Sequence, residues 1–485
     1  MNEPSLKKNF ALSTLYQVLL LVVPFITAPY VSRVLTAEGV GIYSFTNSIQ
    51  MYFSMFAALG TVSYGTREIA RNRNDNIKRS KLFWEIELLT VITSCVCLAI
   101  YGLFIAITCE YRIYFLILGI NIVTVMFDIS WFYTGIEQLR YTVGPNAVFK
   151  IFGVVCIFTF VKAKEDLVKY VFIMSLVTLL SNFTMWAYLP KFVYRIKPSE
   201  LKIKRHFKET LVYFIPTIAT SIYTILDKTL IGLFTTDTSE NGYYEQATKI
   251  VNMAKSLTFA SLNTILGARI SFLFAEEKHA EIKNRIEKSI DYILFMGIGI
   301  CLGIAAVAPR FVPAFFGDGY TPVIQLLYLF SPIIIIIGIS NCLGSQYYNP
   351  AGLRSLSAKF IIAGSIVNLI LNLILIPMMK SKGAVFATLA AETVITVLYM
   401  RFCNGYLNYK AILQYGWKKL IAGMIMFLVI RGIDTILSND IYASIIEVTI
   451  GSIIYIFVLW ILQDSFCKYG IQFAKLHIHR GGNSE

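Results

Sequence analysis

Apolar runs of about 20 residues, separated by short charged segments, repeat along the whole chain. A run of that length crosses the hydrocarbon core of a bilayer as a single α-helix. The pattern therefore predicts an all-α polytopic membrane protein with about fourteen transmembrane helices. The predicted spans are 11–31, 41–65, 86–108, 113–134, 143–161, 167–190, 210–234, 242–268, 291–309, 322–345, 356–378, 384–404, 417–437 and 442–463.

Three short segments of the first half recur in the same order in the second half. Gly41-Ile42-Tyr43 corresponds to Gly242-Tyr243-Tyr244, Gly65-Thr66-Arg67 to Gly267-Ala268-Arg269, and 133–140 to 348–354. Both copies begin on the same side of the membrane, so the predicted repeat is parallel rather than inverted.

The repeat divides the predicted spans into two bundles and a remainder. We expect an N-terminal six-helix bundle at 1–209 and a C-terminal six-helix bundle at 210–410. The last two spans have no counterpart, so 411–485 is predicted to add two transmembrane helices and a tail.

Composition supports a membrane protein and its charge distribution orients it. Of 485 residues, 56% are hydrophobic and 15% charged, and the mean hydropathy is +0.64. The net charge of +14 does not indicate nucleic acid, because the basic residues lie in short loops between apolar spans. With the N-terminus inside, cytoplasmic segments hold more than three times as many Lys and Arg as the opposite side. Both termini are therefore predicted to be cytoplasmic.

The predicted span 242–268 has a polar face despite its length. It carries Glu245, Lys249 and Lys255, and each charge at the bilayer centre costs roughly 2.5–3.5 kcal/mol. Helical periodicity places five polar residues on one face: Glu245, Lys249, Asn252, Ser256 and Asn263. The corresponding span of the first half also has a polar face: Tyr43, Asn47, Gln50 and Ser54. We therefore expect the two bundles to face each other across a polar cavity.

Three cations are predicted at a similar depth in the outer leaflet: Arg33, Lys228 and Lys249. One interpretation is that they bind the phosphates of an anionic substrate, with Asp227 and Glu245 as partial partners. The alternative is that the lysines and acids pair between helices while Arg33 extends to the interface. Asn47 and Asn252 join the predicted cavity lining.

Other charges within the spans are candidates for ion or proton coupling. Asp128 and Lys150 lie near the cytoplasmic ends of neighbouring spans, where they can pair, or where Asp128 can bind a proton or sodium ion. Glu392 and Glu447 are isolated on apolar spans, and Glu392 is a candidate titrating carboxylate. Asp128, Lys150 and Glu392 form the coupling set.

No pattern for enzymatic chemistry is present in the sequence. It contains no Gly-Lys-Ser or Gly-Lys-Thr, so a P-loop NTPase is excluded. All four histidines lie outside the predicted spans and the eight cysteines are scattered. We expect no catalytic residues, no metal site and no cofactor.

Several segments resemble a known family of membrane transporters. The opening from Val23 to Leu35, followed by Gly39-Val40-Gly41-Ile42-Tyr43, is similar to that of Wzx-type polysaccharide repeat-unit flippases. Trp131 to Glu137 and Gln346 to Gly352 are similar to later patterns in these proteins, which belong to the multidrug/oligosaccharidyl-lipid/polysaccharide exporter superfamily. The resemblance covers about residues 7–400.

The resemblance implies a function and a location. It implies two six-helix bundles around a V-shaped cationic cavity, and alternating-access transport of an undecaprenyl-diphosphate-linked oligosaccharide to the outer face of the bacterial cytoplasmic membrane. Such transport serves capsule, exopolysaccharide or O-antigen synthesis. The expected partners are this glycolipid, membrane lipids and other polysaccharide assembly proteins, with no nucleic acid, and we expect a monomer.

Three other functions stay open. A multidrug or cation exporter of the same fold requires a cavity dominated by acidic residues, whereas the predicted outer group is cationic on balance. A membrane-embedded polysaccharide polymerase or ligase requires a large outer loop with Arg or His, and the predicted outer loops are short. A scaffold for polysaccharide assembly would use the long basic cytoplasmic loops.

Overall fold

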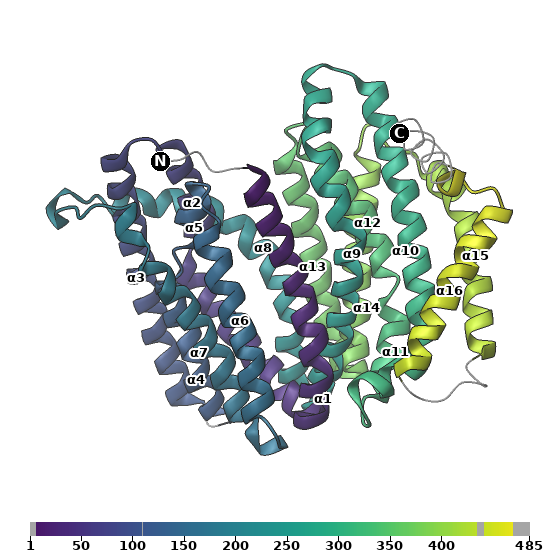
Figure 1. Ribbon diagram of the computed structural model, residues 1–485, viewed down its shortest axis with the longest axis horizontal. Helices are drawn as coiled ribbons and strands as arrows, with labels where there is room; N and C mark the ends of the chain where they lie inside the picture. The colour runs from purple at the N-terminus through teal and green to yellow at the C-terminus, as the bar shows by residue number, and fades with distance from the viewer. Residues whose placement is uncertain (1–5, 109, 434–440, 469–485) are drawn as a thin grey trace, which may run out of the picture. The chain divides into compact units, whose positions relative to one another are not determined.

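The structure is a computed structural model that describes residues 6–108, 110–433 and 441–468, without the side chains of 6–8, 10, 216, 217, 219–223, 257 and 260–268. Asn263 of the predicted polar face and residues 267 and 268 of the second repeat segment therefore lie outside the described side chains. Over the described residues the fold is all-α, which confirms the predicted fold class (Figure 1). The chain forms two compact units, Met1–Gly242 and Tyr243–Glu485.

The first unit contains eight α-helices. They are α1 (Leu6–Ala58), α2 (Thr61–Arg71), α3 (Asn76–Ile107), α4 (Arg112–Met126), α5 (Ser130–Gly135), α6 (Arg140–Phe160), α7 (Leu167–Trp186) and α8 (Lys204–Phe234). Short 3₁₀ turns, η1 (Lys164–Asp166), η2 (Leu189–Lys191) and η3 (Pro198–Glu200), lie in the connections. Helix α9 (Ser239–Ala275) begins in this unit and continues into the next.

The second unit contains the rest of α9 and seven further α-helices. They are α10 (His279–Phe316), α11 (Thr321–Phe330), α12 (Ile333–Leu343), α13 (Arg354–Met379), α14 (Ser381–Arg401), α15 (Tyr409–Ile433) and α16 (Ile441–Ile461). A single π-helical turn, η4 (Gly344–Tyr348), follows α12.

Within the described residues, every predicted span coincides with a helix or with two consecutive helices, and residues 434–437 of the predicted span 417–437 lie outside them. In the described chain, ten helical segments are long and apolar enough to cross a membrane. Large apolar side chains such as Leu103, Ile107 and Met378 are exposed on these helices, as expected where lipid rather than water is the neighbour. The chain is therefore a multi-pass membrane protein.

The first predicted span and most of the second lie within α1, which is interrupted at Thr36, and the second span ends in α2. Thr36 has φ 61° and ψ 176°, so the backbone is not helical there. A non-glycine residue with positive φ is uncommon, and here it separates the stretch containing Arg33 from the stretch containing Asn47.

The two units share local structure that matches the sequence repeat. The Tyr133 hydroxyl donates a hydrogen bond to the Met185 carbonyl near the end of α7, at 2.8 Å. The Tyr348 hydroxyl donates to the Tyr399 carbonyl near the end of α14, at 2.9 Å. Both tyrosines are fully buried. The third repeat segment therefore packs in the same way in each unit, and its sequence similarity has a structural counterpart.

The boundary between the units differs in position from the start of the second repeat. Helix α8 packs against α1, α2 and α3, so it belongs to the first unit, which ends at Gly242. The repeat places the second half at 210. The division into 1–209, 210–410 and 411–485, which was derived from the sequence repeat, stays a prediction.

The last two helices pack against α10 (Figure 1), and buried ion pairs join them to it. Arg310 on α10 and Glu447 on α16 form an ion pair at 2.6 Å with both side chains 1% exposed. The Lys419 ammonium on α15 contacts Asp291 at 2.6 Å and Asp464 at 2.9 Å, and it is fully buried. From its sequence neighbours Glu447 was expected to be isolated on an apolar span. In the structure Arg310 on another helix neutralises it.

Candidate functional site

A polar pocket lies inside the first unit, between α1, α4 and α7. Its volume is about 360 Å³. The residues that line it are Tyr43, Asn47, Asn121, Thr124, Val125, Asp128, Met174, Thr178 and Asn182. Most of these side chains carry amide, hydroxyl or carboxylate groups, which are rare within membrane helices and usually line a water-filled or ligand-filled space.

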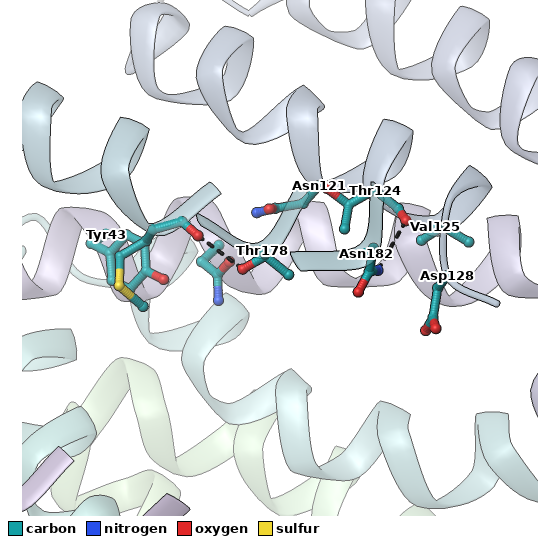
Figure 2. Close-up of a pocket in the computed structure, with 9 residues that line it drawn as sticks. Tyr43, Asn121, Thr124, Val125, Asp128, Thr178 and Asn182 are labelled. Atoms are coloured by element: carbon teal, nitrogen blue, oxygen red, sulfur yellow. Dashed lines mark hydrogen bonds between the residues drawn. The ribbon is translucent and has the colours of Figure 1, made fainter. Parts of the chain in front are cut away.

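Helical spacing explains how α4 and α7 build this pocket. Asn121, Thr124 and Asp128 follow each other at steps of three and four residues, so the first two share one face of α4 and the third lies just beyond its end. Thr178 and Asn182 are one turn apart on α7. Figure 2 shows the two sets facing each other, with the Asn182 side-chain amide donating to the Thr124 carbonyl at 3.2 Å.

Asp128 is placed by the break between α4 and α5. Its carboxylate accepts a hydrogen bond from the Ser130 backbone N–H at 3.0 Å, which satisfies one free donor at the start of α5. The Asp128 and Lys150 side chains do not form an ion pair in the described structure. Asp128 is therefore available to the pocket rather than neutralised by the lysine considered as its partner.

The structure brings together two predicted residues from different sets. Asn47, predicted for substrate, and Asp128, predicted for ion coupling, line the same pocket. Four further polar lining residues were missed: Asn121, Thr124, Thr178 and Asn182. The signal for them was present, because each is a polar residue one turn from another polar residue on an otherwise apolar span.

The predicted cationic group is distributed over both units. Arg33 is exposed and lies one turn before the interruption at Thr36, and Lys228 lies near the C-terminal end of α8. The Asn241 side-chain amide donates to the Lys228 carbonyl at 2.9 Å, which ties the end of α8 to the start of α9. Convergence of these two residues with Lys249 on one anion stays a prediction.

Glu245, Lys249 and Asn252 belong to the polar face predicted for α9, and their side chains are described. Lys249 and Glu245, one turn apart, form an ion pair at 3.4 Å. The Lys249 side chain is 31% exposed and that of Glu245 is 14% exposed, and Asn252 is exposed on the next turn. This pair lies within one helix, whereas the alternative stated above was pairing between helices, and it leaves part of the lysine accessible.

Glu392, the remaining coupling candidate, lies in a polar region of the second unit. It is buried on α14, and the Lys255 ammonium on α9 attracts it electrostatically. One turn away, the Thr388 hydroxyl accepts a hydrogen bond from Asn368 of α13 at 3.4 Å, and Asn372 donates to Asn368 at 3.0 Å. The apolar span that Glu392 occupies therefore meets amide groups on its neighbour.

Solved structures with the same arrangement of helices are membrane transporters. The structure is similar to lipid II flippase MurJ in an inward closed conformation, with a TM-score of 0.74 over 94% of this chain and 98% of that chain at 16% identity. It is also similar to a multidrug resistance transporter of the MATE family, with a TM-score of 0.56 over 85% of this chain and 99% of that chain at 11% identity. The chain therefore shares its fold with both of these proteins.

Sequence comparison places the chain within one family. Residues 6–268 match the family described as polysaccharide biosynthesis protein, and the chain belongs to that family. It is 24% identical over 412 residues to the "Putative O-antigen transporter" of Escherichia coli, covering 83% of this chain and 97% of that protein. It is 26% identical over 263 residues to the "Probable low-salt glycan biosynthesis flippase Agl15" of Haloferax volcanii, covering 53% and 54% of the two chains.

These comparisons confirm the resemblance to Wzx-type flippases of the multidrug/oligosaccharidyl-lipid/polysaccharide exporter superfamily. The relatives and solved structures named above are transporters and flippases.

Proposed function

We propose that this protein is a flippase for a lipid-linked oligosaccharide. It moves an undecaprenyl-diphosphate-linked repeat unit from the inner to the outer face of the bacterial cytoplasmic membrane for capsule, exopolysaccharide or O-antigen synthesis. The observation that carries the proposal is the family match together with a relative named as an O-antigen transporter that aligns over nearly its whole length.

The chemistry of the substrate has three parts, and the chain offers groups suited to each. Arg33, Lys228 and Lys249 provide positive charge for the diphosphate, since charge-assisted hydrogen bonds to phosphate oxygens are among the stronger polar contacts. Asn47 and Asn252 provide amides, which donate to and accept from sugar hydroxyls. The exposed apolar surfaces of the helices suit the polyprenyl tail.

Transport proceeds in this proposal by alternating access to the two sides of the membrane. The sequence contains no P-loop, so in this proposal net flux depends on an ion gradient, on membrane potential or on consumption of the glycolipid by polymer synthesis. Asp128, Lys150 and Glu392 are the coupling candidates. The protein works as a monomer with both termini in the cytoplasm, beside other polysaccharide assembly proteins.

A multidrug exporter is the alternative within the same fold. The similarity to a MATE transporter supports the fold alone, because identity is 11%. The family match favours the glycolipid over a cationic drug.

Deletion of the gene tests the proposal in cells. We expect loss of the surface polysaccharide and accumulation of its lipid-linked repeat unit on the inner face, with both reversed by the wild-type gene. Unchanged polysaccharide in a strain that has no second flippase gene would exclude this function.

A further inference from the structure

Two buried carboxylates lie two residues apart on α3, in opposite environments. Glu85 is fully buried and has three partners: the Arg205 guanidinium, His206 Nε2 at 2.8 Å and the Lys202 backbone N–H at 2.6 Å. Glu87 is 2% exposed, and neither of its carboxylate oxygens has a hydrogen-bond partner within the described structure. The first carboxylate is stabilised as an anion, whereas the second is not.

The charges around α3 reinforce this difference. Helix α3 packs against α1, α2, α4 and α8. Arg205 and His206 of α8 and Tyr64 of α2 gather around Glu85, and burial lowers the pKa of His206 against the opposing effect of that carboxylate. The facing part of α1, residues 40–58, contains no charged residue.

Asp128 is the charged group that acts on Glu87. It follows α4, which packs on α3, and its carboxylate repels a negative charge on Glu87. A carboxylate without a cation or hydrogen-bond donor in an apolar environment is neutralised by a proton, and a nearby second carboxylate strengthens that tendency. Glu87 is therefore neutralised by a proton under conditions in which Glu85 is ionised.

The pocket connects this pair to water. Glu87 is buried, but Asp128 lines the polar pocket with Asn47, Asn121 and Asn182. A polar cavity of this size holds several water molecules, each with amide or hydroxyl partners. The pocket therefore brings water next to Asp128, the carboxylate that acts on Glu87.

We propose that Glu87, beside the pocket carboxylate Asp128, is a proton-binding group in the first unit that is loaded and emptied once in each transport cycle. Glu87 alternates between its protonated and ionised forms, and it exchanges the proton with water in the pocket that Asp128 lines. This assignment rests on the proposed function for its role in coupling and names the proton as the coupling ion. It adds Glu87 to the coupling candidates.

A carbodiimide tests the site without requiring transport. Dicyclohexylcarbodiimide reacts with protonated carboxyl groups in apolar surroundings, and mass spectrometry locates the adduct. In purified full-length protein we expect modification of Glu87, falling as the pH rises, and none of Glu85, which serves as the matched control on the same helix. Modification of Glu85 in preference to Glu87, or an unmodified Glu87 at low pH, would overturn the proposal.

A transport assay distinguishes a carboxyl group that carries protons from a buried acid that stays neutral throughout the cycle. In vesicles, a proton gradient is expected to accelerate flipping by the wild type and by the loop control Glu110→Gln. Glu87→Gln, which reproduces the size of the neutral acid, is expected to fold and to lose the acceleration, whereas Glu87→Asp retains part of it. A Glu87→Gln protein that still responds fully to the gradient would show that the acid is structural.

The two tests also separate this proposal from the proposed function. If the wild type flips no lipid-linked oligosaccharide but the carbodiimide modifies Glu87 as expected, the flippase function fails and the proton site stands. If flipping occurs without any response to the gradient, the proton site fails and the flippase function stands.

Discussion

Gly41 and Gly242 lie in backbone contact and occupy corresponding positions of the sequence repeat. A Cβ on Gly41 would lie 1.8 Å from the Thr238 carbonyl oxygen, and a Cβ on Gly242 would lie 2.1 Å from the Ala37 carbonyl oxygen. Gly41 follows Ala37 by four residues, as Gly242 follows Thr238, so the contact is reciprocal. Small residues at this spacing allow two membrane helices to approach closely, here α1 and the first turn of α9.

Adding one methyl group at this contact is predicted to separate the two helices. The overlapping atom is a backbone oxygen, so no side-chain rotation relieves the clash in Gly41→Ala. Overpacking of this kind costs about 1–3 kcal/mol, which shifts a two-state equilibrium by roughly 5- to 150-fold. Hydrogen exchange of segments 37–41 and 238–242 is expected to accelerate, and export is expected to fall.

Gly144→Ala is the control for that substitution, because a Cβ on this helical glycine of α6 meets no atom within 4 Å. Equal exchange rates in Gly41→Ala, Gly144→Ala and the wild type would show that the contact does not constrain α1 and α9.

The ion pair on α9 distinguishes substrate binding from helix stabilisation. If Lys249 holds a phosphate, Lys249→Gln removes a charge-assisted hydrogen bond of about 1.5–3 kcal/mol and weakens binding roughly ten- to a hundredfold. The surface control Lys283→Gln is expected to have no effect. Transport rates at several glycolipid concentrations provide the measurement.

A double substitution tests the opposite role of the same lysine. If Lys249 only neutralises Glu245, the pair Glu245→Gln and Lys249→Gln restores both folding and transport. Full transport by a normally folded double variant would exclude a substrate contact for Lys249.

The buried pair between α10 and α16 is predicted to be costly to break and inexpensive to replace. Glu447→Gln leaves Arg310 buried without its counter-charge, at a cost of about 3–5 kcal/mol. The melting temperature in detergent is expected to fall, while the exposed control Glu165→Gln leaves it unchanged. Replacing both partners, Arg310→Met with Glu447→Leu, is expected to recover most of the loss.

Labelling of introduced cysteines tests the proposed orientation. Asn74 and Lys283 are exposed in segments predicted to be cytoplasmic, and Asp237 and Asp318 are exposed in segments predicted to be outside. Cysteines at the first two positions should react with an impermeant reagent only in opened cells. Cysteines at the second two should react in intact cells, and the reverse pattern would invert the topology.

The helices and their order were predictable because membrane spans are long apolar runs, and the repeat was visible in its glycines and tyrosines. The sequence repeat aligns Gly41 with Gly242, but it does not indicate that the two glycines are in contact. Contacts between residues far apart in the chain were not predictable. Arg310 and Glu447 lie on helices separated by more than a hundred residues. The sequence around Glu447 does not indicate which residue pairs with it.

The residues of the pocket were predictable in part. Asn47 and Asp128 were singled out because each is polar on an apolar span, and the same reasoning applied to α4 and α7 would have added Asn121 and Asn182. Glu87 was passed over because it lies beside Glu85 near the end of a predicted span, where an acid is expected to face water. Its burial depends on how α4 and the other neighbours cover α3, which the periodicity of α3 alone does not specify.

Flipping of a defined glycolipid by purified protein tests the central claim most directly. Vesicles would contain a fluorescent undecaprenyl-diphosphate-linked oligosaccharide, with a membrane-impermeant quencher reporting its movement between leaflets. We predict faster exchange than in protein-free vesicles, without nucleotide, and slower exchange with Lys249→Gln. Exchange equal to that of protein-free vesicles, from protein whose melting curve shows that it is folded, would contradict the flippase function.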